Sequence, residues 1–175
     1  MQQTDRRSPR AFLRRCAAFP IIAGLSLAGL IGPPHAAQGQ EAAAWRVECT
    51  GDGKTLDCRA VQQLFQRETR QLLVGILARK AHDPKAALLT IQLPLGLNLT
   101  EPVLIKVDNG QPERQPIQTC TNIGCFVSMT ANDKFVAAMR SGQEIKITVQ
   151  DANKKPIEMA LPLLGFGIAF DKARS

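Results

Sequence analysis

The stretch that decides the fold is Thr119-Cys120-Thr121-Asn122-Ile123-Gly124-Cys125-Phe126-Val127. Two cysteines five residues apart, with turn-forming residues between them, favour a local disulfide that closes a turn. The large apolar residues that follow predict a strand that runs from Cys125 through Phe126 and Val127. Asn132 suits the N-cap of a short helix that ends at Gly142. The cysteine pair therefore fixes the chain just before a strand and a helix.

The rest of the chain beyond the N-terminal region is expected to be extended. Short runs that alternate apolar and polar residues, or that are apolar throughout, are separated by turns rich in Gly, Pro, Asn and Asp. The helix from Asn132 to Gly142 presents Phe135, Val136 and Met139 at helical spacing, a pattern that favours a helix seated on the core. The pattern predicts an all-β protein, an antiparallel β-sandwich or barrel with one short helix. The expected strands are 45–49, 56–60, 61–70, 72–78, 86–93, 103–108, 125–129, 144–150, 157–163 and 164–170.

The N-terminal 39 residues have the pattern of a secretory signal peptide. Five arginines within residues 1–15 precede a short apolar run, 16–31, which is followed by prolines and small residues. Ala37-Gln38-Gly39 fits the small-x-small rule, which places cleavage after Gly39 or, as the alternative, after Ala37. An uncleaved membrane anchor is the competing interpretation, but the apolar run is short and contains Pro20. We expect residues 1–39 to be removed by cleavage and residues 40–175 to form a single domain; the arginine pairs leave Sec or Tat export open.

Charge and aromatic content exclude one class of function. The whole chain has a formal charge of +7, but the signal segment holds five arginines and a single acidic residue, so the mature domain is only mildly cationic. A nucleic-acid interface needs a clustered basic face with aromatic residues. The chain has no tyrosine and one tryptophan, Trp45, which we expect to anchor the core. We therefore reject nucleic acid as a partner.

Four cysteines remain after cleavage, namely Cys49, Cys58, Cys120 and Cys125. An even number in an exported domain is typical of disulfides, and four cysteines allow three pairings. The turns between the partners favour the local pairing, 49–58 and 120–125. If Gly53-Lys54 forms a two-residue type II′ loop, Cys49 lies directly opposite Cys58 on an antiparallel pair.

No motif in the sequence nominates catalysis, a cofactor or a metal. The single histidine of the mature chain, His82, lies in a charged loop without a metal-binding partner motif. The spacing of the cysteine pairs matches neither a C-x2-C zinc site nor a C-x-x-C redox motif at a helix start, so structural disulfides are favoured over zinc or thiol chemistry. We expect a protein that is not an enzyme and has no catalytic, cofactor-binding or metal-binding residues.

The assembled features resemble the invasion-associated locus B (IalB) family of exported α-proteobacterial proteins. The similarity spans about residues 45–170 and depends on the order and spacing of its parts. They are Trp45-x-Val47-x-Cys49, Cys58, Leu93-Pro94-Leu95-Gly96, Val107-Asp108-x-Gly110, Cys120-x4-Cys125 with Gly124, the Asn132–Gly142 helix segment, and Leu161-Pro162-Leu163 with Gly165-Phe166 and Ala169-Phe170.

The resemblance implies an immunoglobulin-like β-sandwich in the periplasm or associated with the outer membrane, or secreted, with a role in the invasion of host cells, notably erythrocytes. The partner would be an unknown protein of the envelope or of a host cell, and no membrane span remains after cleavage. Two alternatives stay open: a periplasmic envelope-maintenance or protein-binding factor, and an enzyme, either a small periplasmic hydrolase or a thiol oxidoreductase.

Overall fold

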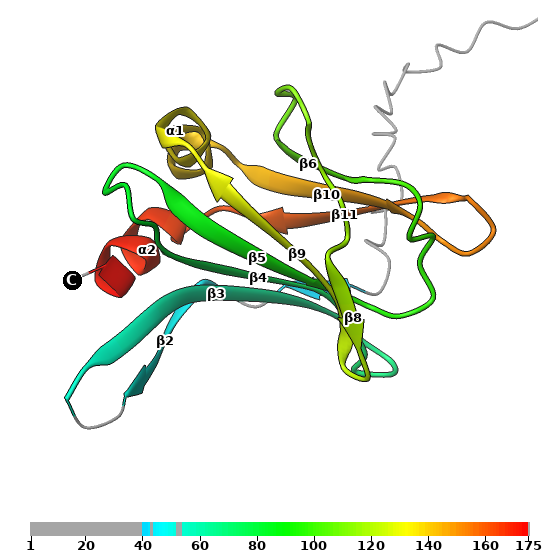
Figure 1. The fold of residues 1–175 in the computed structure, drawn as a ribbon, viewed down its shortest axis with the longest axis horizontal. Coiled ribbons are helices and arrows are strands. Elements are labelled where there is room, and N and C mark those ends of the chain that lie inside the picture. The colour runs from blue at the N-terminus through cyan, green and yellow to red at the C-terminus, as the bar shows by residue number, and fades with distance from the viewer. Residues whose placement is uncertain (1–39, 43, 52–53, 175) are drawn as a thin grey trace, which may run out of the picture. The chain divides into compact units, whose positions relative to one another are not determined.

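Two antiparallel sheets form the described part of the chain, which the computed structural model gives as residues 40–42, 44–51 and 54–174 (Figure 1). The expected signal peptide, 1–39, lies outside the described residues. The larger sheet has seven strands in the order β1-β3-β4-β5-β9-β8, with β2 also paired to β3, and the smaller has the order β11-β10-β6-β7. The elements are β1 (Gln40–Ala42), β2 (Arg46–Gly51), β3 (Leu56–Gln66), β4 (Leu72–Lys80), β5 (Ala87–Leu93), β6 (Val103–Val107), β7 (Glu113–Gln115), β8 (Thr119–Thr121), β9 (Gly124–Ala131), α1 (Asp133–Ser141), β10 (Glu144–Gln150), β11 (Pro156–Pro162) and α2 (Phe166–Arg174).

Alternation along the strands produces one shared core. In β5, Leu89, Ile91 and Leu93 are fully buried while the residues between them are half-buried. The inward residues of β6 and β10 belong to the same buried cluster as those of the larger sheet. Because both sheets contribute apolar faces to one core, burial of these residues stabilises the two layers together.

The prediction of an all-β protein with one short helix is confirmed in part: the described residues form two antiparallel sheets with two helices, and most of the expected strands are present. The polar run 61–70 is extended as far as Gln66, since β3 continues unbroken from Leu56, and a turn follows. The strands expected at 86–93, 103–108 and 144–150 correspond to β5, β6 and β10.

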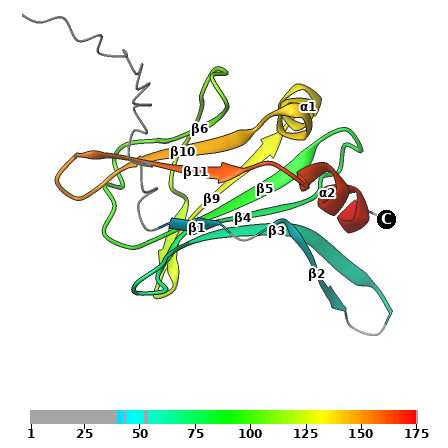
Figure 2. The same ribbon diagram turned by 180° about the vertical axis from the view of Figure 1, so that it is seen from behind.

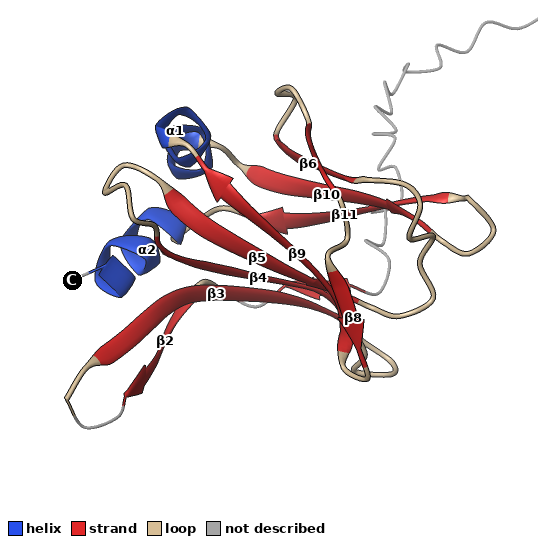
Figure 3. Cartoon of the chain, viewed as in Figure 1, coloured by secondary structure: helices blue, strands red, loops and turns tan. Residues whose placement is uncertain are grey.

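One expectation was wrong: the segment 164–170 is not a strand. Phe166–Arg174 forms a second helix, α2, which lies with α1 at the same end of the two sheets (Figure 3). The period-two interpretation grouped Ile168 with Phe166 and Phe170, but Ile168 is 69% exposed. The buried residues are Phe166, Ala169, Phe170 and Ala173, whose spacing of three, four and seven is that of a helix face.

The first helix has the predicted boundaries and connects the two sheets. The Asn132 side chain accepts a hydrogen bond from the backbone N–H of Phe135 at 2.9 Å, as expected for an N-cap. Val136 and Met139 are buried in the core. Since α1 follows β9 of the larger sheet and precedes β10 of the smaller one, it carries the chain from one layer to the other.

A carbonyl at the end of β11 ties the smaller sheet to the larger one. The oxygen of Pro162 accepts hydrogen bonds from Trp45 Nε1 at 3.0 Å and from Gln62 Nε2 at 2.9 Å. The Trp45 ring is buried and meets Phe166 edge-on, with 4.9 Å between ring centroids. The predicted core role of Trp45 is therefore confirmed.

Candidate functional site

The four cysteines form the two local disulfides that the sequence favoured. Cys49 pairs with Cys58 across β2 and β3, directly opposite in register, with 4.0 Å between their Cα atoms. The bond lies near the end of the β2–β3 hairpin, which extends past the other strands of its sheet (Figure 1). Gly53 is outside the described residues, so the expected turn type stays a prediction, whereas the register that it implied is present.

The second disulfide closes the short hairpin of β8 and β9. Cys120 lies opposite Cys125 with 3.9 Å between Cα atoms, and Cys125 is buried in the core while Cys120 is exposed. Gly124, just before the second cysteine, has a φ of 139°, and a Cβ there would lie 2.4 Å from the backbone oxygen of Leu93. Only glycine fits this approach of β9 to the end of β5.

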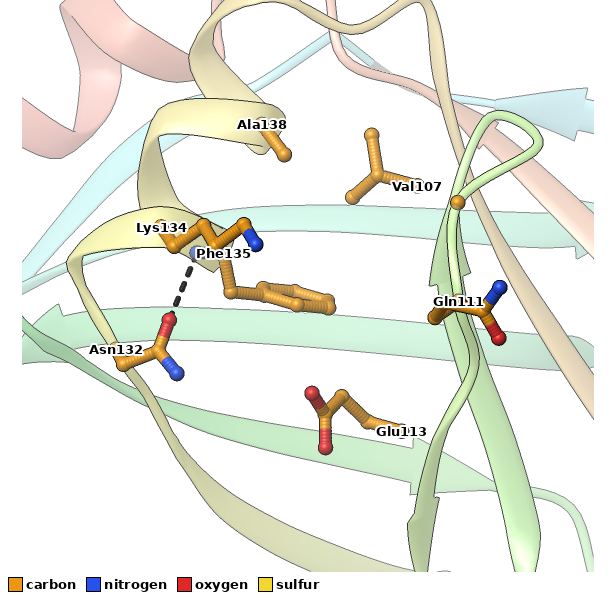
Figure 4. A pocket seen from close by; sticks show the side chains of 8 residues that line it. Val107, Gln111, Glu113, Asn132, Lys134, Phe135 and Ala138 are labelled. Atoms are coloured by element: carbon orange, nitrogen blue, oxygen red, sulfur yellow. Dashed lines mark hydrogen bonds between the residues drawn. The ribbon is translucent and has the colours of Figure 1, made fainter.

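A pocket of about 330 Å³ lies between α1 and the segment that leads from β6 into β7 (Figure 4). Phe135 projects from the first turn of α1 toward this segment, and Val107 and Ala138 form the apolar wall behind it. Gln111 and Glu113 face the ring from the opposite side. The volume is at the lower end of the range for ligand pockets, and an apolar wall with a few polar groups is their usual composition.

Opposite charges border this pocket. Glu113 and Lys134 are both exposed, and neither forms an ion pair or side-chain hydrogen bond with another residue that the structure describes. The Asn132 side-chain oxygen is already engaged in capping α1. The pocket can accept an apolar side chain against Phe135 and can pair a polar or charged neighbour of that side chain with its rim.

A second cavity, of about 360 Å³, lies between β2 and α2. Val47 of β2 and Trp45 just before it line one side, and Ile168, Ala169 and Lys172 of α2, with Gly165 just before it, line the other. Next to it, Leu164 is 89% exposed, so large apolar side chains flank the cavity in solvent.

The described residues form neither a metal centre nor a helix that could cross a membrane. Among the described residues, no three His, Cys, Asp or Glu side chains come close enough to hold a metal ion. His82 is exposed in the loop between β4 and β5. Neither α1 nor α2 has the length and apolar character required to cross a membrane.

Sequence reasoning located the cysteines but missed the pocket. No strand was expected between residues 108 and 125, and Phe135 was expected only to pack on the core. Phe135 is half-buried and lines the pocket as well, because the hairpin after β6 passes beside α1. The turn-forming sequence Asp108-Asn109-Gly110 predicts that the chain reverses after β6. No sequence pattern shows that this reversal lies next to α1, so the pocket could not be predicted from it.

Comparisons with known proteins agree with this structure. A family model described as "Invasion associated locus B (IalB) protein" matches residues 45–174. An invasion protein B homolog of Brucella abortus (strain 2308) is 26% identical over 132 residues, covering 75% of this chain and 76% of that protein. Invasion protein B of Bartonella bacilliformis is 26% identical over 107 residues, covering 60% of this chain and 56% of that protein.

A solved structure shows the same fold. The crystal structure of invasion associated protein B from Bartonella henselae superposes with a TM-score of 0.67 at 21% identity, covering 76% of this chain and 94% of that one. The family model spans most of the chain, including both disulfides and both helices. The chain therefore belongs to the invasion associated locus B (IalB) family.

Proposed function

We propose that this protein is a non-enzymatic binding protein, exported by a cleaved signal peptide to the periplasm or the outer membrane, or secreted, where it aids the entry of bacteria into host cells. The two disulfides support an extracytoplasmic location, because such bonds persist in oxidising compartments. Membership of a family named for invasion supports the host-directed role.

The observation that carries the binding function is the pocket beside Phe135. Its aromatic wall and its two charges, Glu113 and Lys134, which have no ion-pair partner among the described residues, form the kind of site in which an apolar anchor of a partner protein is surrounded by polar contacts. The partner is a protein of the host-cell surface that inserts an apolar side chain against Phe135.

The test uses protein exported to the periplasm of an expression host, so that both disulfides form. Binding of the labelled protein to erythrocyte membranes is compared with binding to bacterial envelope vesicles. Glu113→Lys and Lys134→Glu change rim charges without touching the core and are expected to weaken erythrocyte binding at least about tenfold. Lys155→Glu, in the exposed turn between β10 and β11, is the matched control and should bind like the wild type.

Two results would overturn this function. Erythrocyte binding that is equal in the wild type and in both rim variants would exclude the Phe135 pocket as the contact. A deletion strain that enters host cells normally but loses envelope integrity would replace the invasion role with envelope maintenance.

A further inference from the structure

The edges of the two sheets differ in how they are closed. An edge strand presents a row of unpaired N–H and C=O groups that can pair with another strand, and proteins commonly block such edges with proline or keep them short. The smaller sheet has β11 and β7 at its edges, and the larger one has β8 at one edge and β1 with β2 at the other.

The outer edge of β11 is closed by two prolines. Leu163 N donates to Gln143 O at 2.8 Å, and this pair continues the β10–β11 register, in which Pro162 faces Glu144. Hydrogen-bonded pairs alternate with non-bonded ones along an antiparallel ladder. The even-numbered residues of β11 therefore direct their backbone groups outward, and Pro156 and Pro162 lack an N–H at both ends of that row.

The outer edge of β7 is closed in the same way. Asp108 N donates to Glu144 O at 3.0 Å, so the even-numbered residues of β6 bond to β10 and the odd-numbered ones to β7. The outward positions of β7 and its flanks are then 112, 114 and 116. Pro112 and Pro116 occupy two of these three, which leaves a single outward donor at Arg114.

By contrast, β2 has an open edge. The Cα atoms of Cys49 and Cys58 are 4.0 Å apart, which identifies a non-hydrogen-bonded pair. The backbone N–H and C=O groups of Val47, Cys49 and Gly51 therefore point away from β3. No proline interrupts β2, whereas β8 has only three residues. In the described part of the chain, β2 is the longest edge strand without a proline.

An apolar surface lies beside this open edge. Val47 and Ile168 line the same cavity, and Ile168 and Leu164 are 69% and 89% exposed. Figure 2 shows β2 at the margin of its sheet. A strand added to β2 would bring its own inward side chains next to these residues.

We propose that the protein forms a symmetric homodimer in which β2 pairs antiparallel with β2 of a second copy, centred on Val47. Val47 is an outward-facing position, so a two-fold axis there allows both copies to exchange backbone hydrogen bonds. Within one copy Arg46 already pairs with Glu48 at 2.8 Å. In this register Arg46 also lies opposite Glu48 of the partner subunit, and Glu48 lies opposite the partner subunit's Arg46. Each β2 strand therefore places its positive charge opposite the negative charge of the other copy. The exposed Ile168 and Leu164 of both copies are covered near the axis.

The experiment measures the mass of the oxidised, signal-cleaved protein by light scattering and sedimentation at concentrations up to about 1 mM. We expect a dimer, with hydrogen exchange at Val47 and Cys49 that slows as protein concentration rises. Arg46→Glu places two carboxylates opposite each other on either side of the axis and should weaken dimerisation at least about tenfold. Combining it with Glu48→Arg restores opposite charges and should restore the dimer.

Two further variants separate this interface from a general loss of fold. Ile168→Glu places a charge on the exposed surface of α2 and should give a folded monomer. Leu99→Glu, at a residue that is 57% exposed in the loop between β5 and β6, should leave the dimer intact. A monomer at every concentration overturns the proposal. So does a dimer whose affinity is unchanged by Arg46→Glu and Ile168→Glu.

Discussion

At the scale of single residues, Asp108 and Gly142 allow the end of β6 to pack closely against the end of α1. Asp108 has a φ of 49°, and its carboxylate accepts hydrogen bonds from the backbone N–H groups of Gln143 and Glu144, the latter at 3.0 Å. These donors follow α1, so Asp108 fixes the exit of the helix. Gly142 fits between Asp108 and Val107 because it has no side chain.

We predict that Gly142→Ala destabilises the protein by about 1–3 kcal/mol, because the new methyl group overpacks the joint. Its Cβ would lie 2.5 Å from Val107 Cγ1 and 2.8 Å from the oxygen of Ala138. Gly167→Ala in α2 is the control. Its Cβ would lie 3.3 Å from Arg140 Nη1, which donates to Asp171, and would meet no backbone atom, so we expect a change of less than about 1 kcal/mol in either direction. Urea denaturation of both variants measures the two free energies of unfolding; equal stability of both would contradict the prediction.

At the scale of elements, α2 is held against its surroundings by aromatic packing and by an ion pair with α1. Phe166 and Phe170 stack with 5.4 Å between ring centroids, and the guanidinium of Arg140 lies 5.7 Å from the Phe170 ring. Arg140 also donates two hydrogen bonds to Asp171, at 2.5 and 3.0 Å, which joins α1 to α2. This bond lowers the pKa of Asp171 and raises the pKa of Arg140.

The lowered pKa of Asp171 predicts a pH dependence. A carboxyl with a lower pKa in the folded state contributes stability above its unfolded pKa of about 3.9, and loses it as the pH falls through the folded value. Because the pair is partly exposed, Asp171→Asn should cost at most about 1 kcal/mol at neutral pH. The difference from the wild type should vanish in acid, once the folded carboxyl is protonated. Urea denaturation across pH checks this.

The control for this titration is Glu68→Gln in the turn after β3, an exposed carboxylate without an ion pair among the described residues. Its free energy of unfolding should follow that of the wild type across the same pH range. A difference between Asp171→Asn and the wild type that persists at low pH would rule out the ion pair as the cause.

At the scale of the whole molecule, the two disulfides stabilise different parts of the fold. Each closes a short loop, for which chain entropy gives about 2–3 kcal/mol. Cys125 is 2% exposed and lies in the shared core, so its bond fixes the end of a central hairpin. Cys49 is exposed on a hairpin that extends past the neighbouring strands.

We therefore predict unequal effects when each pair is replaced by alanine. C120A/C125A should lower the global free energy of unfolding by about 2–3 kcal/mol. C49A/C58A should chiefly increase hydrogen exchange within residues 46–59, with a smaller global loss, because the hairpin can open locally. Hydrogen exchange read by mass spectrometry and urea denaturation measure both. A larger loss in the global free energy of unfolding for C49A/C58A than for C120A/C125A would contradict this prediction.

Local sequence patterns determined a large part of this protein. Alternation such as Leu89, Ile91 and Leu93 in β5 specifies a strand with one buried face, because side chains on a strand alternate at period two. The turns between the cysteines favoured the pairing that the structure contains, and Asn132 marked the start of α1. These features depend on neighbours within about ten residues, which a sequence displays directly.

Tertiary structure decided what depends on distant partners. Residues 164–170 fit both the two-residue period of a strand and the 3.6-residue period of a helix. The helix is favoured because it buries Phe166 and Phe170 against Trp45 and the strands beside it while leaving Ile168 in solvent. The Phe135 pocket requires the hairpin after β6 to lie beside α1, and the open edge of β2 requires knowledge of which backbone groups face outward. Local periodicity specifies an element, but packing free energy between elements far apart in the chain determines which faces are covered and which stay available for a partner.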